Sequence, residues 1–222
     1  MNLAEHATAG SAGSRGGRPS REAARQLRER ILESATELML GQGYGATSIE
    51  AVASHAGVSK RTLYHRFADK GELVQAVVAK VVDGARASSL DDATEIEPRE
   101  ALRRFGLTAL RAALSPPVLA LYRLIVAESQ RFPDLLQAVA LSGGRAQAVR
   151  TLSTLLRRER PDLSPAEADF ASQQYLQMLV SLPQLRAMGI GEPMSDEECR
   201  QWVERSLQLL LHGLPGLAHP AA

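Results

Sequence analysis

A short polar segment near the N-terminus carries the residues best suited to bind nucleic acid. Ser59, Lys60, Arg61 and Thr62 follow one another directly. Hydroxyl and ammonium groups bind phosphate oxygens, and an arginine can donate two parallel hydrogen bonds to the edge of a guanine. We interpret Arg61 as a base-reading residue and Lys60 as a phosphate contact. The alternative is that these basic residues form only a solvated surface.

The elements around this segment place it at the start of a short helix. The sequence Thr-Ser-Ile-Glu that begins at Thr47 has the form of a capping box, in which the threonine hydroxyl caps a helix and the glutamate reaches back to it. Gly57 ends that helix, and Ser59 can cap the next one, which runs to about Phe67. Two short helices that meet at a glycine turn have the form of a helix-turn-helix, whose second helix can enter the major groove of DNA.

Hydrophobic periodicity predicts helices along most of the chain, and strand-like alternation is absent. Apolar residues recur at spacings of three and four from residue 21 to about 40, from 69 to 86, and in further segments between 99 and 213. The polar, acidic stretch 87–98 is the best boundary. We therefore predict an all-α protein with these parts: a flexible basic arm at 1–20, a helix-turn-helix domain at 21–68, a connecting helix at 69–86, a C-terminal domain at 99–213 and a tail at 214–222.

Composition agrees with a globular protein whose basic end is the N-terminus. The chain has 222 residues, of which 45% are hydrophobic and 23% are charged. The net charge is only +1, which by itself favours no class of partner. Residues 1–66, however, contain nine Lys and Arg against six Asp and Glu. The positive charge is therefore concentrated in the half that contains the helix-turn-helix.

No residue pattern indicates a cofactor, a metal site or an enzyme. The single cysteine, Cys199, excludes an intrachain disulfide, and no Cys and His residues have metal-ligand spacing. His55 and His65 fall in the helix-turn-helix region and His212 ends the last predicted helix, so no acid, base and nucleophile gather together. No apolar run reaches the roughly 18 residues of a membrane span, and the N-terminal segment lacks the compact apolar core that is typical of a signal peptide. We expect a soluble cytoplasmic protein with no membrane partner.

The order and spacing of the motifs around the glycine turn are also those of a known family. A capped helix at Thr47 leads to Ala56-Gly57-Val58-Ser59, then to Leu63-Tyr64-His65-Arg66-Phe67, and then to Lys70-Gly71-Glu72-Leu73. In this arrangement the segment 25–80 resembles the TetR family of bacterial transcription regulators. The segment 121–133 is similar to the C-terminal domain of a branch that includes AefR-like and AcrR-like members.

This resemblance implies an all-helical homodimer. Each chain would have a three-helix DNA-binding domain, a fourth connecting helix, and a C-terminal domain that holds an inducer pocket and the dimer interface. The operator would be approximately palindromic, with half-sites about 34–36 Å apart or at a related helical spacing. Many relatives have a small residue at the position of Arg61, so this chain departs from the family there. The resemblance further implies DNA-backbone contacts by Thr47, Ser48, Tyr64, His65 and Lys70.

The predicted arm contains Gly17-Arg18-Pro19, which resembles the core of an AT-hook. In that interpretation Arg18 enters the narrow minor groove of A·T-rich DNA. The alternative is a disordered tail whose arginines add only nonspecific attraction. If the arm contacts DNA, removal of residues 1–20 should lower affinity without abolishing specificity.

Apolar residues at helical spacing in the C-terminal domain by themselves indicate an ordinary core. Together with the resemblance, the polar residues among them indicate an effector pocket. Glu128 and Arg123 are expected to pair with each other or with solvent, which favours a small, mainly apolar effector. The expected pocket residues are Phe105, Tyr122, Ile125, Val126, Ser129, Gln173, Gln174 and Gln177.

The last two predicted helices contain more apolar residues than one face of each helix needs. These residues are Leu176, Leu179, Leu182, Leu185, Trp202, Val203, Leu207, Leu209, Leu210 and Leu211. The surplus fits a homodimer interface, although a monomer core would show the same periodicity. The resulting hypothesis is a repressor that occludes a promoter and is released by an effector. Control by a protein partner, and activation instead of repression, are alternatives that the sequence leaves open.

Overall fold

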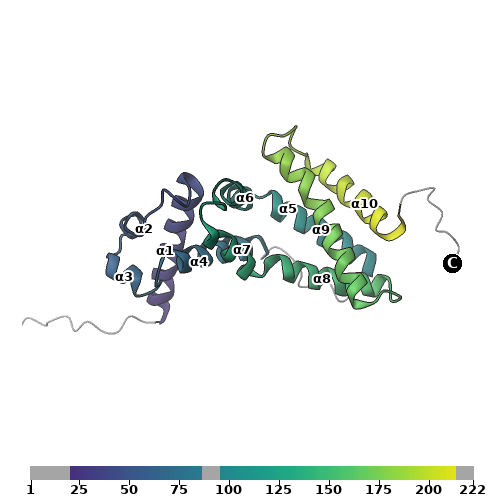
Figure 1. Ribbon diagram of the computed structural model, residues 1–222. Coiled ribbons are helices and arrows are strands. Elements are labelled where there is room, and N and C mark those ends of the chain that lie inside the picture. The colour runs from purple at the N-terminus through teal and green to yellow at the C-terminus, as the bar shows by residue number, and fades with distance from the viewer. Residues whose placement is uncertain (1–20, 87–95, 214–222) are drawn as a thin grey trace, which may run out of the picture.

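The computed structural model describes residues 21–86 and 96–213, and these residues form helices and no strand (Figure 1). The prediction of an all-α fold is confirmed. Residues 1–20, including Arg18, and the tail 214–222 lie outside the described part of the chain. The helices are α1 (Arg21–Gln42), α2 (Ile49–His55), α3 (Lys60–Tyr64), α4 (Lys70–Arg86), α5 (Pro98–Leu114), α6 (Pro116–Glu128), α7 (Pro133–Ser142), α8 (Gly144–Glu159), α9 (Pro165–Ala187) and α10 (Asp196–His212).

Helices α1 to α4 enclose the first of two hydrophobic cores. On α1, Ile31, Ala35 and Met39 are fully buried, and their spacing of four residues places them on one face of the helix. Leu63 of α3 and Phe67 just beyond it pack into the same core. A helix as short as α3 is held by such tertiary contacts rather than by its own propensity.

The second core lies at the far end of the molecule, between α5, α8, α9 and α10. It includes one fully buried leucine from each of these four helices: Leu102, Leu152, Leu179 and Leu207. Capping boxes start α9 and α10, where Ser164 pairs with Glu167 and Ser195 with Glu198. Each box satisfies two backbone groups that a helix start would otherwise leave unpaired.

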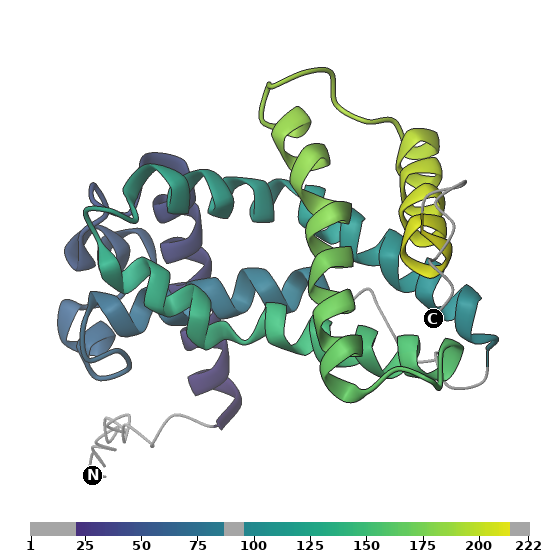
Figure 2. The same ribbon diagram turned by 45° about the vertical axis from the view of Figure 1, so that its right-hand side comes forward.

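Helices α6 and α7 pack against the N-terminal half even though they follow α5 in the chain. Leu121 and Leu124 of α6, and Leu135 and Ala138 of α7, belong to the first core. Figure 2 shows α7 running alongside α4, with α9 and α10 at the opposite end from α2 and α3. The α6 helix ends at Glu128. The first core is therefore formed by helices from both sides of the predicted boundary at 87–98.

The described helices include none that is by itself long and apolar enough to cross a membrane. Taken together, α5 and α6 satisfy that test of length and composition, but they meet at an angle of 62°.

The second core contains a buried hydroxyl whose removal should not harm the fold. Tyr175 has no exposed surface, and no described residue forms a hydrogen bond with its hydroxyl. An unpaired buried polar group disfavours folding by about 1–3 kcal/mol, so Tyr175→Phe should raise the free energy of unfolding by about 1 kcal/mol or leave it unchanged. Urea denaturation followed by circular dichroism measures this. Tyr122→Phe, at a residue that is 37% exposed, is the control and should have no effect. A clear loss of stability in Tyr175→Phe alone would contradict the prediction.

Candidate nucleic-acid interface

The glycine turn orients α3 so that one side packs inward and the other faces solvent. Gly57 has a φ of +64°, in the left-handed region that glycine tolerates best. The Ser59 side chain then accepts a hydrogen bond from the amide of Thr62 at 3.1 Å and caps α3, as the sequence predicts. Because Leu63 is fully buried, the opposite side of α3 is left exposed. That side carries Lys60, Arg61, Tyr64 and His65.

Arg61 is a basic residue of this face whose side chain remains unpaired among the described residues. No described residue forms an ion pair or hydrogen bond with its guanidinium. Lys60, in contrast, forms an ion pair with Glu50 of α2, and its ammonium lies 5.8 Å from the centre of the Tyr64 ring. The hydrogen bond with Lys60 lowers the pKa of Glu50, and the same bond raises the pKa of Lys60. Arg61 can therefore engage a ligand without first breaking a contact.

The hydroxyl groups near α3 shape the turn as well as its surface. The Ser59 and Thr62 hydroxyls lie 2.7 Å apart. Ser48 is exposed and caps α2, accepting a hydrogen bond from the amide of Ala51 at 3.0 Å. The prediction that Thr47 caps this helix is wrong, because the cap lies one residue later. Exposed hydroxyls beside helix starts are groups that can contact phosphate.

Thr47 and Lys70, for which the family resemblance implies contacts to the DNA backbone, both form hydrogen bonds with the loop between α1 and α2. Thr47 is only 1% exposed, and its hydroxyl donates to the carbonyl of Gly43 at 2.8 Å. Lys70 is partly buried and donates to the carbonyl of Tyr44, with its ammonium 4.1 Å from the centre of that ring. Burial lowers the pKa of Lys70. In this structure both residues hold the loop between α1 and α2 rather than face outward with α3.

A contact that the sequence did not predict connects this loop to the C-terminal half. The Glu128 carboxylate at the end of α6 accepts a hydrogen bond from the amide of Gly45 at 2.6 Å. The rings of Tyr44 and Phe132 meet edge to face, with centroids 5.1 Å apart. Arg123, which we expected to pair with Glu128 or with solvent, is exposed and donates to the carbonyl of Ala187 at 3.3 Å. We call the contacts of Glu128 and Phe132 with residues 43–45 the loop clamp.

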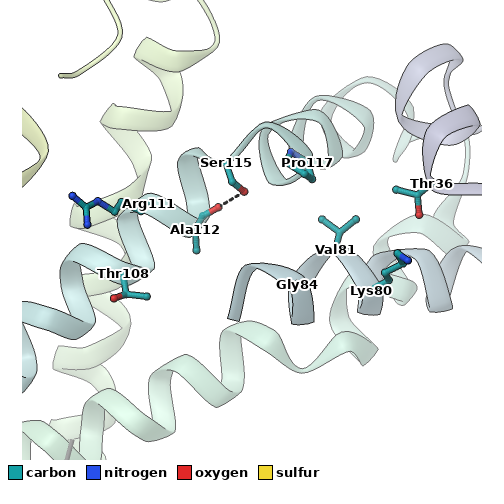
Figure 3. A pocket seen from close by; sticks show the side chains of 9 residues that line it. All are labelled: Thr36, Lys80, Val81, Gly84, Thr108, Arg111, Ala112, Ser115 and Pro117. Atoms are coloured by element: carbon teal, nitrogen blue, oxygen red, sulfur yellow. Dashed lines mark hydrogen bonds between the residues drawn. The ribbon is translucent and has the colours of Figure 1, made fainter. Parts of the chain in front are cut away.

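A hollow of about 600 Å³ lies where the two halves meet, which we call the junction hollow (Figure 3). Its lining comes from α1, α4, α5 and the start of α6. It does not include the eight residues predicted to bind an effector. Phe105 is buried in the second core, Val126 is 64% exposed, and Gln173, Gln174 and Gln177 are exposed on α9. Tyr122, Ile125 and Ser129 lie on or just after α6, away from the end that lines the hollow.

Two family models match the chain. The model described as bacterial regulatory proteins of the tetR family matches residues 31–77, which include α2 and α3. The model described as the AefR-like transcriptional repressor C-terminal domain matches residues 100–213, about half of the chain. The two matches together include the exposed face of α3 and both ends of the loop clamp.

Individual relatives agree with the family models. A DNA-binding transcriptional repressor TetR of Mycobacteroides abscessus is 27% identical over 82% of this chain and 77% of its own length. The regulator TtgR of Pseudomonas putida is 32% identical, but over only 40% of this chain and 44% of its own.

Solved structures extend the similarity to the whole fold. The flavonoid-responsive regulator FrrA superposes with a TM-score of 0.70 at 27% identity, covering 84% of this chain and 96% of its own. A TetR-family transcriptional regulator from Mesorhizobium loti has the same TM-score at 25% identity, covering 85% and 96%. The similarity thus includes both halves of the chain and their mutual arrangement.

Proposed function

Since this chain belongs to the TetR family of bacterial transcriptional regulators, we propose that it is a repressor that binds a palindromic operator as a homodimer and leaves it when a small effector binds. The family consists of regulators and not of enzymes. Relatives named as repressors support the direction of control. The observation that carries the proposal is the exposed face of α3, on which the Arg61 guanidinium has no described partner.

In the proposed complex α3 lies in the major groove and Arg61 donates to a guanine. Lys60 neutralises a phosphate after giving up Glu50, because a surface ion pair is weak enough to exchange. The remaining contacts position the helix on the DNA backbone. They come from Ser48, Ser59, Thr62, Tyr64 and His65.

The dimer contact of the proposal lies on α9 and α10. Five of the ten apolar residues predicted for this contact are buried in the second core of the same chain. They are Leu176, Leu179, Val203, Leu207 and Leu211. Leu182, Leu185 and Leu209 are between 37% and 46% exposed. A second copy that covers these leucines would remove them from water. Sedimentation of the purified protein should then report twice the mass of one chain.

The effector of the proposal is small and mainly apolar. A flavonoid is the first compound to try, because the similar structure FrrA is described as flavonoid-responsive. Any effector can weaken operator binding only by as much as it prefers the released conformation over the DNA-bound one.

The proposal is tested with duplex DNA taken from immediately upstream of the coding sequence. Its binding is compared with that of a shuffled duplex of equal length, at two salt concentrations. We expect preference for the upstream duplex and weaker binding at high salt, because the release of cations from the phosphates favours binding less when the salt concentration is high. Equal binding to both duplexes would overturn specific recognition at this site. No binding to either would overturn the DNA assignment.

The arm offers a separate measurement with the same duplexes. Removing residues 1–20 should weaken binding and reduce its salt dependence, while the preference for the upstream duplex remains. Unchanged affinity and unchanged salt dependence would contradict a role for Arg18 in the minor groove.

A further inference from the structure

The junction hollow is built from both halves of the protein. Thr36 lies on α1 of the N-terminal half, and Val81 and Gly84 lie on α4. Ala112 of α5 and Pro117 of α6 face them (Figure 3). Its volume of about 600 Å³ lies within the range of ligand sites. A molecule seated here would touch the helices that carry the DNA-binding half and the helices that follow the connection.

The polar side chains around the hollow are mostly engaged already. The hydroxyl of Thr36 donates to the Leu32 carbonyl and that of Ser115 donates to the Ala112 carbonyl, both at 2.7 Å. Thr108, in contrast, has a hydroxyl with no hydrogen-bond partner among the described residues. The lining therefore offers one free hydroxyl to a ligand.

The two basic residues at the hollow are turned to other partners. Lys80 pairs with Glu29 and, at 3.7 Å, with Glu33. The Arg111 guanidinium points away from the neighbouring lining side chains and lies 4.0 Å from Asp196 (Figure 3). A negatively charged ligand would have to compete with these carboxylates for Lys80 and Arg111, whereas an uncharged one would leave both ion pairs in place. The chemistry of the hollow thus favours an uncharged molecule.

We propose that the effector binds in the junction hollow, and that it is a neutral, mainly apolar molecule with one polar group directed to Thr108. This inference rests on the proposed function and assigns its effector site. It places the site outside the set of eight residues that the sequence indicates in the C-terminal domain.

The position of the hollow gives a direct route to the DNA-binding half. The start of α6 lines the hollow at Pro117, while the end of α6 carries Glu128 of the loop clamp. The 13 residues between these ends span roughly 20 Å as a rigid helix. A ligand that pushes α6 away from α4 would therefore also shift the anchor of the loop that precedes α2.

The test fills the hollow and measures binding of a neutral probe. N-phenyl-1-naphthylamine fluoresces in apolar sites, and its sulfonated relative 1-anilinonaphthalene-8-sulfonate is the charged counterpart. Gly84→Leu is the filling variant, because a Cβ at Gly84 would meet nothing within 4 Å. Gln174→Leu adds a leucine at an exposed residue of the predicted C-terminal pocket and is the matched control. Ala112→Leu fills the hollow from the facing wall and replaces Gly84→Leu if that variant does not fold.

We expect the neutral probe to saturate at one site per chain and to bind more tightly than the sulfonate. Gly84→Leu should lower the affinity for the neutral probe at least about tenfold, equivalent to 1.4 kcal/mol, while Gln174→Leu leaves this affinity unchanged. Unchanged probe binding in Gly84→Leu and Ala112→Leu, or loss of binding only in Gln174→Leu, would overturn the proposed site. Titration of the upstream duplex with the same samples separates the two ideas. Absence of DNA binding would overturn the proposed function. The proposed effector site is judged separately, by the probe titrations alone.

Discussion

Replacing Arg61 with alanine should remove the preference of the protein for its operator. Arg61 is exposed on α3 beside the buried anchor Leu63, and no described residue holds its guanidinium. A bidentate contact to guanine contributes about 1–3 kcal/mol of discrimination, so operator affinity should fall by that amount. Binding to a shuffled duplex should fall much less, because it depends on total charge. Fluorescence anisotropy with both duplexes at one salt concentration measures the difference.

Two further variants separate geometry from charge in this prediction. Arg61→Lys keeps the positive charge but loses the planar pair of donors, so it should resemble the alanine variant in specificity. Lys60→Ala should weaken binding to both duplexes by the same factor, since the proposed partner of Lys60 is a phosphate. An equal loss on both duplexes for Arg61→Ala would show that Arg61 contributes only charge.

Replacing Gly43 with alanine should destabilise the protein more than the same change at Gly57. Both glycines have positive φ, +98° and +64°, in a region that alanine rarely adopts. At Gly57 the added Cβ would meet nothing within 4 Å. Backbone strain alone should then lower the free energy of unfolding by about 1–2 kcal/mol. At Gly43 the Cβ would lie 2.4 Å from a Glu128 carboxylate oxygen. Backbone strain and the loss of the hydrogen bond between Glu128 and Gly45 should then together lower the free energy of unfolding by about 2–4 kcal/mol.

A double-mutant cycle identifies the source of that difference. In the Glu128→Ala background the carboxylate is absent. There, Gly43→Ala should lower the free energy of unfolding only by the cost of backbone strain, which is also the loss expected for Gly57→Ala. Urea denaturation of all four proteins, with Gly57→Ala as reference, gives the comparison. Equal losses from Gly43→Ala with and without Glu128 would contradict the loop clamp in solution.

The local features of the fold were accessible from the sequence because neighbouring residues determine them. The glycine turn at Gly57 and the cap at Ser59 each depend on contacts within a few residues. The cap of α2 shows the limit of such signals. Thr47 and Ser48 both have hydroxyls, and a shift of one residue decides which one caps and which one is buried.

The loop clamp and the junction hollow could not be predicted in this way. Glu128 and Gly45 are 83 residues apart, and neither belongs to a motif that names the other. Periodicity identifies an apolar face on α6 but not the helix that covers it. Leu121 and Leu124 therefore fit a C-terminal core as well as the N-terminal one in which they lie. The hollow adds the same difficulty, because its lining comes from four helices.

The loop clamp also determines how this regulator can be recombined with others. A chimera joined within the connection at 87–95 would transfer the helix-turn-helix but leave Glu128 and Phe132 behind. Tyr44 would then lose its aromatic neighbour, and the first core would lose the leucines that α6 and α7 supply. The smallest portable DNA-reading unit is therefore discontinuous, consisting of residues 21–86 together with 116–142. A hybrid regulator built from this protein would therefore need both segments.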